Sequence, residues 1–320
     1  MSAIATPFVQ GTDAWLEARR RGVGASEIPV IAGESPYRSA LELWAEKSGR
    51  VKPEPDAETA ELFEIGHLME PVLLELYERR TGRHPKRVNR MLAHREIPWA
   101  LASLDAQAPV RRVVEGKWTH STRWRSEGIP DDVLMQCQWQ LFVTGWDVAD
   151  VVALVGRSAR VVEVPRDQSL IDDLYRLAAA FWAHVESGVP PEPDGSESAR
   201  RTLARLHPLD DGTVLPATPD LVELVDLYRS AKVAKTAAED AEKSIGNALR
   251  AVIRDASGIE GLCTYRKSDD STRTNWPAVA SAFRQLVTGH PDPVLDAIVG
   301  LHSETAQGPR VLRLSKGEPK

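Results

Sequence analysis

Cysteine is scarce in this chain, whose 320 residues include only Cys137 and Cys263. Two cysteines cannot ligate a four-cysteine iron–sulfur cluster, which excludes the enzyme classes built around one. One disulfide is the most that they allow. So few cysteines favour a reducing cytosol as the compartment.

Long apolar runs and a nucleotide-binding glycine motif are absent as well. No apolar run approaches the roughly 18 residues that a membrane-spanning helix needs. The first residues, MSAIATPFVQGTDAW, lack a basic segment followed by an apolar stretch, so no signal peptide is predicted. No GxxxxGKS/T motif occurs, and an ATP-driven activity is therefore not expected. We expect a cytoplasmic protein without a membrane partner.

Positive charge is not in excess, since the formal net charge is −6. Taken alone, this sum argues against a nucleic-acid partner, but the distribution of charge is more informative. The segment from Arg79 to Arg95 carries seven basic residues and no acidic one. Further basic clusters occupy Arg19–Arg21, Arg111–Arg112 and Arg123–Arg125. They predict a basic surface, with ordinary solvated faces as the alternative.

The chain does contain an aspartate followed, after nine residues, by Glu115-Gly116-Lys117. Asp105 closes an apolar run that predicts a buried strand, and residues 112–117 predict a second strand. Side chains two apart on a strand share a face, so Glu115 and Lys117 point the same way. If the strands are neighbours, two carboxylates and an ammonium converge. Such carboxylates hold Mg²⁺, which assists phosphodiester cleavage. A surface hairpin with one solvated Glu-x-Lys pair is the alternative.

Two helical residues are candidates to join this site. Glu70 directly precedes Pro71 inside a helix predicted over residues 58–81, where a proline costs about 3 kcal/mol. Such local rule-breaking is expected where a function demands it, so Glu70 is predicted to face the site. Gln136, on a helix predicted over residues 133–144, could reach a metal-bound water. An exposed glutamate and a solvated glutamine are the alternatives.

A possible anion site lies near the N-terminus. Arg19–Arg21 are followed by Gly22, Gly24 and then Ser26, at a predicted helix start. Free backbone N–H groups at such a start favour a bound phosphate. Ser26 could equally be only an N-cap, and both roles could hold at once.

The order of predicted elements divides the chain into three parts. In residues 1–189 the predicted order is helices, two strands, a helix, two strands and a helix. This order predicts an α/β domain with a central mixed sheet flanked by helices. Residues 190–219, rich in Pro, Gly, Ser and Asp, are predicted to be a linker. Residues 220–320 form a mainly helical extension, with a long alanine-rich helix over 220–256, a short strand and a helix near 276–287. That long helix fits a coiled-coil arm or a packed hairpin.

Six segments, in this order, are RRRGVGASEIPVIAGESPYRSALELWAEKSG, FEIGHLMEPVLLELYERRTG, PWALASLDA, VVEGKW, DVLMQCQWQLFVTG and VVEVPRD. They resemble the YqaJ-type viral recombinase family, the phage exonucleases similar to lambda exonuclease. This family belongs to the PD-(D/E)xK nuclease superfamily, so the resemblance implies a restriction-endonuclease-like core. It covers about residues 13–187.

The resemblance implies a role for each matching residue. Asp105, Glu115 and Glu70 would ligate the metal. Lys117 would be the catalytic lysine, and Gln136 would lie near the active site.

The resemblance also implies how the substrate is held and what is done to it. Arg19 and Ser26 would bind the 5′ phosphate of a double-stranded DNA end. The activity would be a metal-dependent, ATP-independent exonuclease that removes one strand from its 5′ end and leaves a 3′ single strand. That product would pass to a single-strand annealing protein. Mg²⁺ is the expected cofactor, with Mn²⁺ as the alternative.

We also expect a homo-oligomer, such as a trimeric ring, encoded by a phage or prophage and working in the bacterial cytoplasm. Two rival functions stay open. One is a structure-specific or restriction-like endonuclease on the same fold. The other is a non-catalytic protein that binds DNA ends, suggested by Gly116 in the Glu-x-Lys motif and by the extra C-terminal helices.

Overall fold

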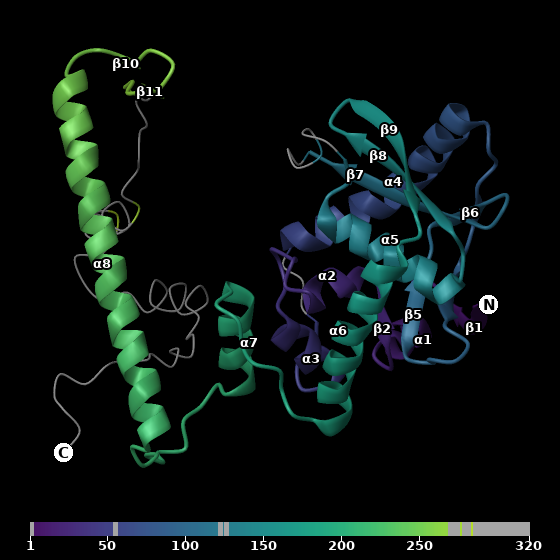
Figure 1. The fold of residues 1–320 in the computed structure, drawn as a ribbon, viewed down its shortest axis with the longest axis horizontal. Coiled ribbons are helices and arrows are strands. Elements are labelled where there is room, and N and C mark those ends of the chain that lie inside the picture. Colours follow the sequence, from purple (N-terminus) through teal and green to yellow (C-terminus); the bar gives the residue numbers. More distant parts are fainter. Residues whose placement is uncertain are drawn as a thin grey trace. The chain divides into compact units, whose positions relative to one another are not determined.

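The computed structural model describes residues 3–53, 57–120, 124, 128–267, 276 and 283 (Figure 1). Two units divide the chain, Met1–Pro208 and Leu209–Lys320. Most of the helix predicted near residues 276–287 lies outside the described residues, as does the C-terminal tail.

The first unit is a mixed α/β domain. Its elements in chain order are β1 (Ile4–Val9), α1 (Asp13–Arg19), β2 (Val23–Gly24), η1 (Ala25–Glu27), α2 (Ile28–Ile31), α3 (Ala40–Lys47), α4 (Ala57–Thr81), β3 (Lys86–Arg87), β4 (Arg90–Ala93), β5 (Ala100–Ser103), β6 (Ala106–Ala108), β7 (Arg112–Thr119), α5 (Asp131–Thr144), β8 (Val148–Val155), β9 (Ser158–Pro165), α6 (Gln168–Ser187) and α7 (Glu197–Leu206).

A five-stranded sheet of order β3-β6-β7-β8-β9 is central to this unit. β7 and β8 run parallel, so they need a crossover, and α5 provides it. The other neighbouring strands are antiparallel. β8 reads VADVVALV and is buried along most of its length. A continuous apolar run of this kind is typical of a strand whose two faces are both covered.

Alternate residues of the central sheet pack against different helices. Val114 and Val152 lie in one apolar cluster with Leu73 of α4. Val113 and Val151 lie in the main core, which also takes in buried residues of α5 and α6. α4 therefore covers one face of the sheet and α5 covers the other, and α6 packs against α5 (Figure 1). This confirms the predicted α/β fold with a mixed sheet flanked by helices.

A second, four-stranded sheet has the order β1-β4-β5-β2. β2 runs parallel to β5, with Val23 beside Ala100. β5 leads through Leu104 and Asp105 directly into β6 of the central sheet. The segment around β2 is therefore hydrogen-bonded to β5, the strand that leads to Asp105.

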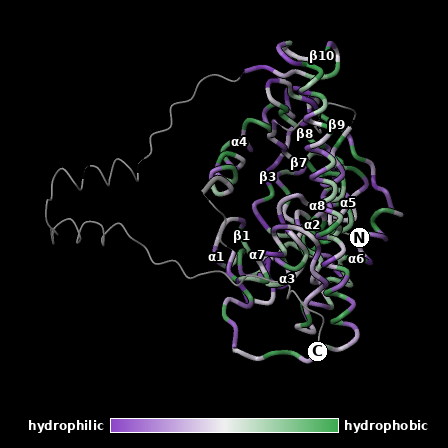
Figure 2. The backbone as a smooth tube through the Cα atoms, turned by 90° about the vertical axis from the view of Figure 1, so that its left-hand side faces the viewer, coloured by the Kyte–Doolittle hydropathy of each residue, from purple (hydrophilic) through white to green (hydrophobic). Residues whose placement is uncertain are grey.

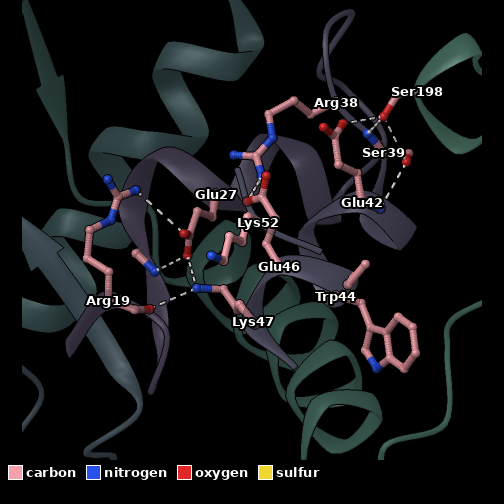
Figure 3. Close-up of polar contacts among 12 residues, drawn as sticks. Arg19, Glu27, Arg38, Ser39, Glu42, Trp44, Glu46, Lys47, Lys52 and Ser198 are labelled. Carbon is pink, nitrogen blue, oxygen red and sulfur yellow. Dashed lines mark hydrogen bonds and ion pairs between the residues drawn. The ribbon is translucent and has the colours of Figure 1, made fainter. Parts of the chain in front are cut away.

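The predicted linker, residues 190–219, contains the helix α7. The buried Ser198 of α7 donates a hydrogen bond to Glu42 Oε2 (2.5 Å) and accepts one from the N–H of Ser39 (2.9 Å) (Figure 3). This contact joins α7 to the start of α3. The first unit consequently extends to Pro208, past residue 189, because the polar composition that suggested a linker belongs partly to a packed helix.

The second unit consists of α8 (Pro219–Ile253) and an antiparallel pair of short strands, β10 (Gly258–Ile259) and β11 (Cys263–Thr264). α8 agrees with the long helix predicted over residues 220–256. Short hydrophobic stretches alternate with hydrophilic ones along the chain (Figure 2). Within the described residues, no helix has the length and apolar character needed to cross a bilayer.

Candidate active site

The two predicted carboxylate positions lie on adjacent strands. β6 pairs antiparallel with β7, and Asp105 stands just before β6 while Glu115 lies inside β7. The backbone N–H of Gly116 donates to Asp105 Oδ2 at 2.8 Å. Because Gly116 follows Glu115 directly, this hydrogen bond fixes Asp105 beside the Glu-x-Lys strand.

The middle position of the Glu-x-Lys motif is glycine for a packing reason. A Cβ atom on Gly116 would lie only 3.0 Å from Leu73 Cδ1 of α4. The absence of a side chain lets α4 approach β7 closely. A side chain at this position would require Leu73 to shift by a few tenths of an ångström, whereas the hydrogen bond to Asp105 uses only the backbone N–H.

Glu115, Lys117 and Gln136 form a closed set of contacts. Lys117 Nζ lies 2.8 Å from Glu115 Oε1 and donates to Gln136 Oε1 at 2.9 Å. Gln136 Nε2 donates to Glu115 Oε1 at 2.6 Å. The strand alternation brings the first two side chains to one face, and α5 brings Gln136 over them. The structure thus unites these three predicted residues with Asp105.

Gln140 also belongs to this cluster, although its position in the sequence alone predicts no role for it. Its Nε2 donates to Glu115 Oε2 at 2.7 Å, so both oxygens of Glu115 accept a hydrogen bond from a glutamine of α5. Gln136 and Gln140 are four residues apart on a helix, a spacing that places two side chains on the same face. That spacing was the available signal. Within the described chain, Gln140 Oε1 is buried without a hydrogen-bond partner.

Glu70, the predicted third ligand, lies on α4 and forms an ion pair with Arg87 at 3.5 Å. Its charge helps to raise the pKa of Asp105, after the larger effects of burial and of Glu115, so it lies within electrostatic range of the cluster. Among the residues that the structure describes, no three His, Cys, Asp or Glu side chains are grouped closely enough to hold a metal ion. The site thus contains two carboxylates, Asp105 and Glu115, while Glu70 pairs with Arg87 and acts on Asp105 through its charge.

The electrostatics of this pair fit a hard divalent cation. Burial, and then the negative charge of Glu115, raise the pKa of Asp105 to about 8. Burial disfavours the charged form of Lys117, but the Glu115 carboxylate outweighs it and raises the pKa of the lysine, which stays an ammonium. The two carboxylates are hard oxygen donors, the kind that Mg²⁺ prefers.

In the absence of metal, Asp105→Asn is expected to reduce the pH dependence of stability. A carboxyl whose pKa is about 8 when folded and 3.8 when unfolded binds a proton only in the native state between those values. Stability should therefore fall as the pH rises through this range. Urea unfolding in EDTA at about pH 5 and about pH 8 measures the fall. Equal falls in wild type and Asp105→Asn would contradict this role of Asp105.

Arg19 and Ser26, the predicted phosphate ligands, are neighbours in the structure. Arg19 Nη2 donates to Ser26 Oγ at 3.4 Å. The guanidinium also lies over the Trp15 ring, 4.8 Å from its centroid, and is about one-third exposed. Gly24 occupies the N-cap of η1, so Ser26 lies inside the turn and is not itself the N-cap.

A buried ion pair between Glu27 and Lys47 holds the backbone of Arg19 in place (Figure 3). Lys47 Nζ lies 2.8 Å from Glu27 Oε2 and donates to the carbonyl oxygens of Arg19 (3.0 Å) and Gly22 (2.5 Å). Glu27 also accepts from the N–H of Gly24 (2.7 Å) and contacts Arg19 Nη2 (3.5 Å). Two cations and one carboxylate leave one positive charge in excess. No pattern in the sequence predicts that Lys47, at the end of α3, is buried.

Comparison with known proteins finds a family match and a related protein. Residues 14–147 match the YqaJ-like viral recombinase domain. The uncharacterized protein YqaJ of Bacillus subtilis strain 168 is 28% identical over 253 residues, which cover 76% of this chain and 79% of that protein. The match over residues 14–147 confirms the resemblance to this family that the sequence motifs indicate.

Two solved structures are similar at lower identity. The alkaline exonuclease LHK-Exo from Laribacter hongkongensis is 22% identical, with a TM-score of 0.46, over 61% of this chain and 100% of that chain. A phage-related exonuclease from Haemophilus somnus 129PT is 14% identical, with a TM-score of 0.41, over 52% of this chain and 95% of that chain.

Proposed function

We propose that this chain is a metal-dependent, ATP-independent exonuclease that degrades one strand of linear duplex DNA from its 5′ end and leaves a 3′ single strand for recombination. The observation that supports this most directly is the Glu115 carboxylate. It is buried, accepts hydrogen bonds from Gln136 and Gln140, and pairs with Lys117 beside Asp105. The match to a viral recombinase domain family supports a role in DNA recombination.

Asp105 and Glu115 would hold a divalent cation, Mg²⁺ or alternatively Mn²⁺, which supplies an activated water and neutralises charge on the phosphate being cut. Lys117 presents a partly exposed ammonium, which stabilises negative charge that develops on the phosphate. Gln136 holds that ammonium beside Glu115, and Gln140 fixes the other carboxylate oxygen. Glu70 would become the third carboxylate ligand of the cation once its ion pair with Arg87 is broken.

Arg19 and Ser26 would set the polarity of digestion. A guanidinium can bind two phosphate oxygens at once, and a terminal 5′ phosphate offers more free oxygens and more charge than an internal one. The excess positive charge beside Glu27 and Lys47 suits this ligand. An enzyme that anchors the 5′ phosphate removes nucleotides from that end.

The proposed activity also suggests a substrate and partners for this protein. The substrate is a double-stranded DNA end, and the basic segment from Arg79 to Arg95 suits its phosphate backbone. The 3′ single strand would pass to a single-strand annealing protein. The enzyme would act as a homo-oligomer, such as a trimeric ring, in the cytoplasm of a bacterial host that carries the phage or prophage.

Digestion of linear duplex DNA with Mg²⁺ tests this function. One strand is labelled internally near its 5′ terminus, substrates with a 5′ phosphate and a 5′ hydroxyl run in parallel, and a covalently closed circle and EDTA serve as controls. We expect rapid release of label from the phosphorylated end, an intact circle and no reaction in EDTA.

The other results separate the rivals. Cutting of the closed circle would identify an endonuclease on the same fold. Binding to DNA ends without cleavage under Mg²⁺ or Mn²⁺ would identify a non-catalytic end-binding protein. Equal rates for both 5′ ends would contradict the phosphate role of Arg19 and Ser26 while leaving the nuclease intact.

A further inference from the structure

The helix α8 is long, and its apolar side chains have no contacts that bury them in the part of the chain that the structure describes. Ile253 is the one residue of α8 that is buried there. Large apolar residues along it are exposed, with values of 62% for Leu224, 62% for Leu227, 64% for Ile245 and 75% for Val252. A helix of this kind owes its stability in water mainly to packing of its apolar face, so a partner surface is needed.

One series of apolar residues on α8 follows a coiled-coil spacing, while Leu221, Val225, Tyr228 and Leu249 lie outside it. From Leu224 to Val252 an apolar residue recurs at alternating intervals of three and four. The series, here called the α8 seam, is Leu224, Leu227, Ala231, Ala234, Ala238, Ala241, Ile245, Ala248 and Val252. A seven-residue repeat of this kind keeps one stripe facing a partner helix. The alanines in the middle allow that helix to approach closely.

Charge along α8 falls into four consecutive blocks of alternating sign. The acidic blocks are Asp220, Glu223 and Asp226, then Glu239, Asp240 and Glu242. The basic blocks are Arg229, Lys232 and Lys235, then Lys243, Arg250 and Arg254. Reversing the direction of the helix exchanges every acidic block for a basic one, so the pattern is complementary to its own reverse.

We propose that the α8 seam is a self-association surface that pairs with the α8 seam of a second copy of this chain, in antiparallel orientation. In that orientation, with Leu224 opposite Val252, the first acidic block lies opposite Arg250 and the C-cap residue Arg254, and the second lies opposite Lys235. In a parallel, in-register pair, all four blocks would face blocks of the same sign. Like charges across an interface disfavour association, so the charge pattern selects the antiparallel arrangement.

Residues that flank the seam agree with this orientation. Lys235 and Glu242 each follow directly after a seam alanine, at the position that faces its own equivalent in an antiparallel coiled coil and a different position in a parallel one. They lie on opposite sides of the seam's centre. An antiparallel partner can therefore bring its Glu242 toward Lys235, and its Lys235 toward Glu242.

Substitution within the full-length chain tests the proposal by sedimentation analysis. Ala238→Glu places a charge in the centre of the α8 seam, and Val233→Glu places the same charge on an exposed apolar residue outside it. Pairing through α8 joins two copies, or two of the ring-shaped oligomers proposed above, so we expect wild type to contain an even number of copies. Ala238→Glu should halve the mass and weaken pairing about a hundredfold, because it would leave an unpaired charge buried in the interface. Val233→Glu should leave the mass unchanged.

Cross-linking in the same full-length protein tests the orientation. Cys263 is exposed and is replaced by serine, while Cys137 is buried. Single cysteines are then introduced as Leu224→Cys and Val252→Cys. With a short bis-maleimide, an antiparallel pair should cross-link a mixture of the two variants much more than either variant alone.

Three results would overturn the proposal. A wild-type monomer, or a single trimer that does not associate further, would mean that α8 does not pair with a second copy. An oligomer whose mass is unchanged by Ala238→Glu would place association elsewhere. Cross-linking of each variant with itself, and not with the other, would show a parallel pair. None of these results depends on nuclease activity.

Discussion

Replacing Lys117 with methionine is expected to lower the rate of DNA cleavage about a thousandfold while DNA binding is retained. Methionine keeps most of the length of the side chain but removes the ammonium. That ammonium is the one cation in direct contact with Glu115 in the described structure, at 2.8 Å. A positive group that stabilises developing negative charge contributes on the order of 10²–10³ in rate. Its loss also leaves Gln136 Oε1 without the lysine as donor.

Initial rates on a 5′-phosphorylated linear duplex measure this effect, with thermal unfolding as the check on folding. Lys52→Met is a matched control, because it removes one ammonium from an exposed side chain of the same unit. It should cleave at the wild-type rate. Cleavage by folded Lys117→Met at the wild-type rate would show that Lys117 is not catalytic.

Strand alternation made part of this site predictable. Side chains alternate between the two faces of a strand, so Glu115 and Lys117 share a face in any fold that makes this segment a strand. Asp105 lies beside them if its own strand is the neighbour of that strand. These are local rules, and β6 and β7 follow them. The α/β class was predictable for the same reason, because helical and strand periods alternate along the chain.

Contacts between distant elements were not predictable in this way. Gln140 depends on how α5 is rotated over β7, and sequence spacing fixes only its relation to Gln136. The ion pair of Glu70 with Arg87 depends on where β3 joins the sheet edge. The packing of Ser198 on α3 spans 159 positions between Ser39 and Ser198, in a segment whose composition is typical of a linker.

Replacing Lys47 with methionine is expected to destabilise the first unit by about 3–5 kcal/mol. The lysine side chain is 3% exposed and the Glu27 side chain is 7% exposed. Removing one partner of such a pair leaves the other charge buried and uncompensated, at a cost of this size. The change also removes the hydrogen bonds to the carbonyl oxygens of Arg19 and Gly22, which lie in the turn between α1 and β2.

Urea unfolding followed by tryptophan fluorescence measures the loss, since the midpoint shifts with the free energy of unfolding. Lys52→Met is again the matched control and should unfold like wild type. If Lys47→Met unfolds at the wild-type urea concentration, the Glu27–Lys47 pair contributes little to folding, and the explanation for its burial is wrong.

The double variant Glu27→Gln/Lys47→Met separates the buried charge from the lost packing. Burial raises the pKa of Glu27, but Lys47 and Arg19 outweigh it and lower the pKa, so Glu27 is ionised in the native state. Glutamine removes that charge, and the double variant should recover stability relative to Lys47→Met. It should not recover the preference for a 5′ phosphate over a 5′ hydroxyl, because the backbone of Arg19 still lacks the lysine that holds it. A double variant no more stable than Lys47→Met would show that the uncompensated charge of Glu27 is not the cause of the destabilisation. A double variant with the wild-type preference for a 5′ phosphate would show that Lys47 does not position Arg19.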